Sequence, residues 1–147
     1  MTDINLTLDE MKAIAILYRD ANLVHASGEM TRVLFADDAS IEYHVTYAGR
    51  TLDLNVNVEE MMEHLESGQY KNTTTSKVLA ETFEVAGPNT LCYQGKVETT
   101  RLGNGLIEEA GEATYIIDSV MTVGFKVVSG RILISSLKNV YTKSLKQ

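Results

Sequence analysis

The chain has 147 residues, of which 44% are apolar and 22% are charged, as in an ordinary globular protein. This length fits one domain, residues 1–147. Thirteen basic residues against twenty acidic ones give a net charge of −7. That balance argues against a nucleic-acid partner, because a phosphate backbone favours a basic surface.

The sequence carries no signal for secretion or for a membrane. Its single cysteine, Cys92, excludes an intrachain disulfide and a thiolate metal site. The start MTDINLTLDE lacks the features of a signal peptide, and no run approaches the roughly 18 apolar residues of a membrane span. We expect a cytoplasmic protein without a membrane partner, and we interpret Lys138, Lys143 and Lys146 as a solvated C-terminal tail.

The chain begins with a helical pattern. Thr7 and Glu10 form a capping box, and the apolar spacing that follows predicts a helix from about Leu8 to Ala26, which Gly28 ends. A short second helix is predicted over residues 29–35.

From Ala39 the apolar period changes to two. The segments ASIEYHVTY and RTLDLNV flank Ala48-Gly49, which predicts a hairpin. Asn57 and Glu60 resemble a second capping box, and they open a short third helix that stops at Gly68.

The rest of the sequence alternates like strands joined by glycine turns. Helices first and strands later predict the α+β class, with the N-terminal helices packed on one face of a strongly curved, mainly antiparallel sheet. A cleft between helix and sheet is a common ligand site. The predicted strands are TSKVLAETFEVA, TLCYQGKVETTRL, EATYIIDSVMTVGFKVV and RILISSLKNVYTK.

The element order resembles the cone-like fold of the nuclear transport factor 2-like superfamily. LFADDASIEYHV, residues 34–45, is similar to the segment of ketosteroid isomerases and SnoaL-like polyketide cyclases that runs into their first strand. SGRILISSLKN, residues 129–139, resembles their closing strand. The resemblance implies a homodimer formed through the outer sheet face, with an apolar small molecule in the cone.

The resembled catalytic positions depart from the isomerase pattern. Tyr43 stands where the isomerase has its carboxylate base, and the place of the second acid falls near Val123. The first-helix tyrosine would match about Ala21, with Tyr18 one turn away. Isomerase chemistry by that mechanism is therefore not expected.

Strand alternation divides the candidate residues between two faces. The apolar residues at every second position should point into the cone, and His44 should point outward. A bulge could instead place His44 in the cleft as the base. Asp118 is either a general base with a raised pKa or a surface carboxylate paired with Arg101 or Lys96. The residues predicted to line the ligand are Tyr18, Tyr43, Val45, Tyr115, Ser119, Met121 and Val123.

Two functions remain open from the sequence. One is a protein that holds an apolar small molecule in its cone and that, as an enzyme, would be a cofactor-free acid–base isomerase, dehydratase or cyclase in which Tyr43, His44 or Asp118 acts. The other is a non-catalytic homodimeric binding or protein-interaction module of the same fold. Phosphate-loop, hydrolase and metalloprotease motifs are missing, so we expect no cofactor and no metal.

Overall fold

The structure is a computed structural model that describes residues 5–23, 28–47, 49–67, 73–103 and 111–146. No helix among these residues is long and apolar enough to cross a membrane. The helices are α1 (Leu8–Leu23), α2 (Gly28–Arg32) and α3 (Val58–Ser67). The strands are β1 (Phe35–Tyr47), β2 (Arg50–Val56), β3 (Thr73–Gly87), β4 (Thr90–Gly103), β5 (Gly111–Val128) and β6 (Arg131–Leu145).

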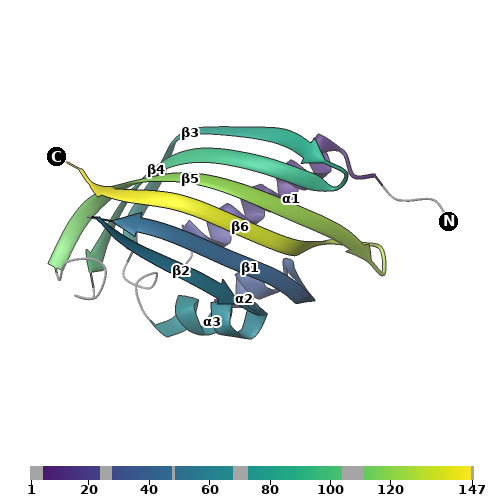
Figure 1. Cartoon of the computed structure of the whole chain (residues 1–147), viewed down its shortest axis with the longest axis horizontal. Coiled ribbons are helices and arrows are strands. Elements are labelled where there is room, and N and C mark those ends of the chain that lie inside the picture. The colour runs from purple at the N-terminus through teal and green to yellow at the C-terminus, as the bar shows by residue number, and fades with distance from the viewer. Residues whose placement is uncertain (1–4, 24–27, 48, 68–72, 104–110, 147) are drawn as a thin grey trace.

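The strands form one six-stranded sheet in the order β2-β1-β6-β5-β4-β3. All neighbours are antiparallel except β1 and β6, which run parallel. The sheet curves, and α1 lies across one of its faces while α2 and α3 lie beside β1 and β2 (Figure 1). The predicted α+β class and curved, mainly antiparallel sheet are confirmed.

Both predicted capping boxes are present. The Thr7 backbone N–H donates to Glu10 Oε1 (3.0 Å), and the Glu10 N–H donates to Thr7 Oγ1 (3.1 Å). The same exchange joins Asn57 and Glu60 at 3.2 and 2.9 Å. These bonds satisfy amide groups that have no partner within the helix, so they fix where α1 and α3 begin.

The boundary between α2 and β1 differs from the prediction. The second helix ends at Arg32, and Phe35, which was expected in that helix, opens β1 opposite Ile134. The Leu34 carbonyl oxygen already accepts a hydrogen bond from the Ile134 N–H at 2.8 Å. Pairing with β6 therefore overrides the helical pattern of this segment.

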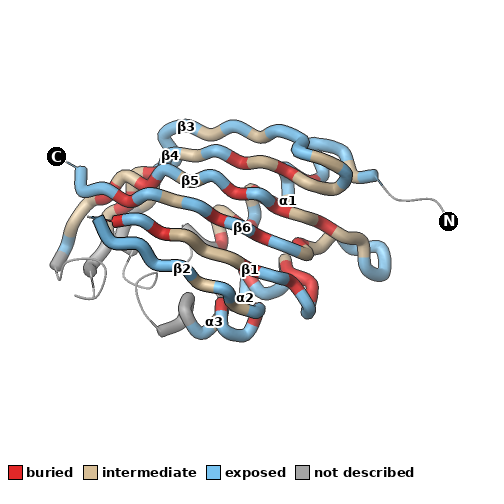
Figure 2. The backbone as a smooth tube through the Cα atoms, in the orientation of Figure 1, coloured by how far each residue is buried: buried red, intermediate tan, exposed pale blue. Residues whose placement is uncertain are grey.

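The core lies between α1 and the face of the sheet that it covers, which we call the concave face. Buried and exposed residues alternate along β1, β4, β5 and β6, as expected where only one face of a sheet is covered (Figure 2). The largest buried side chains of this core include Met11, Tyr18, Ile41, Met61, Leu91, Ile134 and Leu137. We call the opposite side of the sheet the convex face.

The helix α1 offers a matched test of this packing. Met11 is 0% exposed and Leu17 is 53% exposed, although both lie on the same helix. We expect Met11→Ala to lower the free energy of unfolding by about 2–5 kcal/mol, because it removes buried methylenes and leaves a cavity. Leu17→Ala should change it by less than about 0.5 kcal/mol. Urea unfolding followed by circular dichroism measures both, and equal losses would contradict the assignment of the buried side of α1.

Candidate ligand-binding site on the concave face

Two tyrosine hydroxyls meet between α1 and the sheet. Tyr18 on α1 is 2% exposed, and its hydroxyl oxygen lies 3.1 Å from that of Tyr43 on β1. The Tyr18 ring also packs edge-on against Phe35, with ring centroids 5.6 Å apart. A hydrogen-bonded hydroxyl pair within an apolar core can donate to or accept from a third polar atom.

A buried amide oxygen lies next to this pair in the sheet. Asn139 on β6 stands opposite Tyr43 on one side and Met121 on the other. It is 8% exposed, and its Oδ1 is buried with no hydrogen-bond partner in the part of the chain that the structure describes. Because an unsatisfied buried acceptor costs about 1–3 kcal/mol, a ligand donor at this atom would recover much of that cost.

The other residues that were predicted to line the ligand also lie at strand positions that face the concave side of the sheet. Met121 and Val123 belong to the same packed core as Tyr18 and Tyr43. Val45 is buried further along β1, and Ser119 is half-buried opposite Gly95 and Tyr141.

Tyr115 is fully buried and lies at a distance along the strands from the Tyr18–Tyr43 pair. It packs edge-on against Tyr47, with ring centroids 5.7 Å apart. Since Tyr43 and Tyr47 are four residues apart on one strand, these two regions are separated by about 13 Å at 3.3 Å per residue.

The two candidate bases lie on the convex face instead. The His44 Nδ1 is 2.7 Å from Asp53 Oδ1 on β2, and its Nε2 is 3.3 Å from Glu42 Oε2. Asp118 pairs with Lys96 at 3.8 Å, and more than half of each side chain is exposed. The structure therefore does not bring His44 or Asp118 together with Tyr43, and strand alternation had predicted this separation.

Sequence reasoning missed a polar cluster that does face α1. Nη1 of Arg19 contacts both carboxylate oxygens of Glu81 on β3, and the Tyr93 hydroxyl donates to Glu81 Oε2 at 3.1 Å. Only 14% of the Arg19 side chain and 22% of the Glu81 side chain are exposed. Burial, together with the neighbouring Glu81 charge and hydrogen bond, raises the pKa of Tyr93 above its usual range.

The signal for this cluster was a glycine within a strand. Gly95 stands opposite Glu81, and a Cβ at Gly95 would lie 2.2 Å from the Tyr93 hydroxyl oxygen. Glycine in a strand interior often marks such a close approach. The ladder between β3 and β4 shifts between Val78 and Ala80, so simple alternation does not carry through β3.

The prediction that Lys143 belongs to a solvated tail is wrong. The residue lies within β6, opposite Tyr47 and Ile117, and is 4% exposed. Its ammonium nitrogen is 5.7 Å from the centre of the Tyr115 ring, which is cation–π distance.

Among the residues that the structure describes, no group of three or more His, Cys, Asp or Glu side chains could hold a metal ion.

No protein-family model matches this sequence, and no curated protein matches it significantly. Solved structures do resemble it. A SnoaL-like polyketide cyclase from Shewanella denitrificans is 13% identical over 89% of each chain, with a TM-score of 0.65. A ketosteroid isomerase-like protein from Erwinia carotovora atroseptica is 16% identical over 98% of this chain and 99% of its own, with a TM-score of 0.55.

A third similar structure is a nuclear transport factor 2-like protein of unknown function in nutrient uptake from Rhodospirillum rubrum. It is 11% identical over 95% of this chain and 100% of its own, with a TM-score of 0.62. These likenesses confirm the fold that the sequence resemblance implied: the chain has the cone-shaped nuclear transport factor 2-like fold.

The contacts of His44 can be tested by titration. Hydrogen bonds to Asp53 and Glu42 raise the pKa of His44 above 6.5. The contacts therefore stabilise the fold below about pH 6.5, and this stabilisation is lost as pH rises through the folded-state pKa. In an NMR titration we expect Asp53→Asn to lower the pKa of His44. The control Asp118→Asn removes another carboxylate from the convex face and should lower the pKa of His44 less. A wild-type pKa at or below 6.5 would contradict these contacts.

Proposed function

We propose that this protein binds a small molecule with an apolar body and one polar group, held between α1 and the concave face of the sheet. The observation that carries the proposal is that Tyr43, whose hydroxyl is hydrogen-bonded to that of Tyr18, and Asn139, whose oxygen is buried, occupy neighbouring strand positions on one apolar face. Ligand sites usually combine apolar walls with a few placed polar atoms. A ligand hydroxyl would donate to Asn139 Oδ1 and accept from the tyrosine pair.

The similar structures support a ligand of this class. Two of them are named for polyketide cyclisation and for likeness to ketosteroid isomerase, and both names refer to ring-forming or ring-containing molecules with polar oxygens. Because one fold hosts many functions, these names support the class of ligand and not a particular reaction.

Binding without turnover is the function that the geometry supports best. An acid–base enzyme needs a carboxylate or histidine that reaches the ligand, and His44 and Asp118 lie on the convex face. Glu81 does face α1, but Arg19 and Tyr93 hold both of its oxygens.

A cofactor-free isomerase, dehydratase or cyclase is the second candidate. The observation that favours it is that a carboxylate, Glu81, and a hydroxyl pair, Tyr18 and Tyr43, lie on the same side of the sheet. Glu81 would have to leave Arg19 to accept a proton, while Tyr43 would polarise a ligand oxygen.

A matched pair of probes tests the binding site. Thymol has an apolar ring with one hydroxyl, and p-cymene is the same molecule without the hydroxyl. We expect thymol to bind more tightly by about tenfold, since its hydroxyl satisfies a buried acceptor worth about 1–3 kcal/mol. Isothermal titration calorimetry measures both affinities.

Two variants test whether the preference for thymol over p-cymene arises at the Asn139 oxygen. Asn139→Leu removes the buried oxygen and should abolish most of the preference for thymol, whereas Thr46→Val removes an exposed side-chain hydroxyl from the convex face and should preserve it. Equal binding of thymol and p-cymene to the wild-type protein, or no binding of either, would contradict the proposed site.

We also propose that the protein forms a homodimer through the convex face. Val120 and Val140 stand opposite each other on neighbouring strands, and each is 45% exposed. Pairing two copies there would cover this apolar centre, while the Lys96–Asp118 and His44–Asp53 contacts lie beside it.

The dimer is tested by placing a charge in its centre. We expect Val120→Asp to shift the protein from dimer to monomer, because it buries a carboxylate against its own symmetry copy. Val85→Asp, at an exposed valine on β3, is the control and should leave the dimer intact. Native mass spectrometry at micromolar concentration measures the mass, and a monomeric wild-type protein would overturn the proposal.

A further inference from the structure

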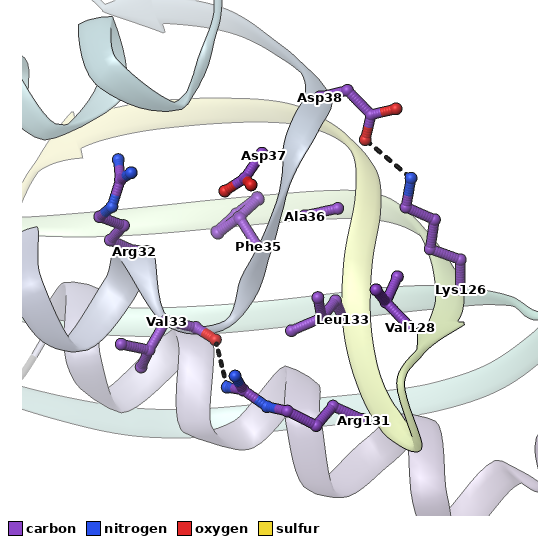
Figure 3. A pocket seen from close by; sticks show the side chains of 10 residues that line it. All are labelled: Arg32, Val33, Phe35, Ala36, Asp37, Asp38, Lys126, Val128, Arg131 and Leu133. Atoms are coloured by element: carbon purple, nitrogen blue, oxygen red, sulfur yellow. Dashed lines mark hydrogen bonds and ion pairs between the residues drawn. The ribbon is translucent and has the colours of Figure 1, made fainter.

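A second hollow lies outside the concave face. It has a volume of about 440 Å³ and sits where the chain passes from α2 into β1, beside the turn between β5 and β6 (Figure 3). This volume is within the range of small-molecule sites, about 300–1,000 Å³. Its lining residues are Arg32, Val33, Phe35, Ala36, Asp37, Asp38, Lys126, Val128, Arg131 and Leu133.

Irregular strand pairing creates this groove. Phe35 pairs with Ile134 and Ser40 with Ser136, so residues 36–39 of β1 bulge opposite Ser135 alone. The ladder between β5 and β6 also shifts, between Gly124 and Phe125. Bulges change the direction in which side chains point, and they occur frequently next to binding sites. Here Asp38 points toward Lys126 of β5, while the Asp37 carboxylate lies on the side of Arg32 (Figure 3).

Most charges around the groove are already neutralised. The Lys126 ammonium donates to Asp38 Oδ1 at 2.7 Å, and Arg32 pairs with Glu59. Asp37 is exposed and makes no hydrogen bond or ion pair with any described residue. Arg131 makes one bond in the described chain, from Nη2 to the Val33 carbonyl oxygen at 3.4 Å, which leaves most of its five donors unused.

The two uncompensated charges are thus one acid and one base. In Figure 3, Phe35 lies between the carboxylate of Asp37 and the guanidinium of Arg131. The apolar side chains of Val128 and Leu133 continue this surface. A ligand that matches the groove has a positive end, a negative end and an apolar middle.

We propose that the groove is a binding site for a zwitterionic, apolar molecule of dipeptide size. Its ammonium group bonds to Asp37, its carboxylate accepts hydrogen bonds from Arg131, and its side chains pack on Val128 and Leu133. A dipeptide carries one ammonium and one carboxylate, about 7 Å apart along an extended chain. A simple anion would leave Asp37 unpaired, and a simple amine would leave Arg131 unused.

The test uses the dipeptide leucyl-leucine and two capped forms. Acetylation removes the ammonium charge, and amidation removes the carboxylate. In a ¹H–¹⁵N NMR titration of the full chain we expect leucyl-leucine to shift the amides of residues 35–39 and 131–133. Each capped form should bind about tenfold more weakly, because one charged hydrogen bond is lost.

Charge-removing variants and matched controls complete the experiment. Asp37→Asn and Arg131→Gln should each weaken leucyl-leucine about tenfold, while Arg131→Lys retains part of the affinity. Glu84→Gln and Lys77→Gln remove exposed charges from β3 and should leave binding unchanged. These four positions are exposed or at a strand end, and circular dichroism checks that each variant is folded.

Several results would overturn the inference. They include an absence of shifts at the groove amides, capped dipeptides that bind as well as the free one, and unchanged affinity in both Asp37→Asn and Arg131→Gln. Shifts confined to concave-face residues such as Met121 would also overturn it while supporting the separate ligand site there.

Discussion

The structure depends on covering one face of a single curved sheet. Six strands in one layer leave two faces, and strand alternation makes the concave face apolar. The helix α1 buries Met11, Ala15 and Tyr18 against that face, and the capping box of Thr7 and Glu10 fixes where the helix begins. The Tyr18 hydroxyl reaches Tyr43 only because this helix lies across the sheet. The contact between Arg19 and Glu81 attaches the same helix to β3.

Local sequence rules predicted the features that depend on neighbouring residues. Both capping boxes, the strand meander and the opposite directions of Tyr43 and His44 followed from spacing and alternation. Features that depend on distant pairing were not predicted. The sequence alone does not show that β1 runs parallel to β6, nor that Lys143 is buried against the Tyr115 ring. Glu81 was missed because the irregular ladder of β3 interrupts the alternation that was sufficient elsewhere.

The fold accounts for the shape of the molecule, while individual side chains distinguish this chain from others of similar shape. Solved structures with 11–16% identity share its architecture, so the architecture alone selects no ligand. In the two sites that we propose, a ligand would be selected by polar groups within apolar surroundings. On the concave face these groups are the tyrosine hydroxyls and the Asn139 oxygen, and in the groove they are the charges of Asp37 and Arg131. The two proposed sites differ in chemistry, since one is buried and neutral and the other is exposed and charged.

The central claim is that the concave face holds an apolar ligand through these neutral polar atoms. A crystal structure of the protein grown with thymol tests it most directly. The claim predicts electron density for thymol between α1 and the sheet, with its hydroxyl within hydrogen-bond distance of Asn139 Oδ1 or the Tyr43 hydroxyl. A concave face closed by its own side chains, with thymol absent or bound elsewhere on the surface, would contradict it.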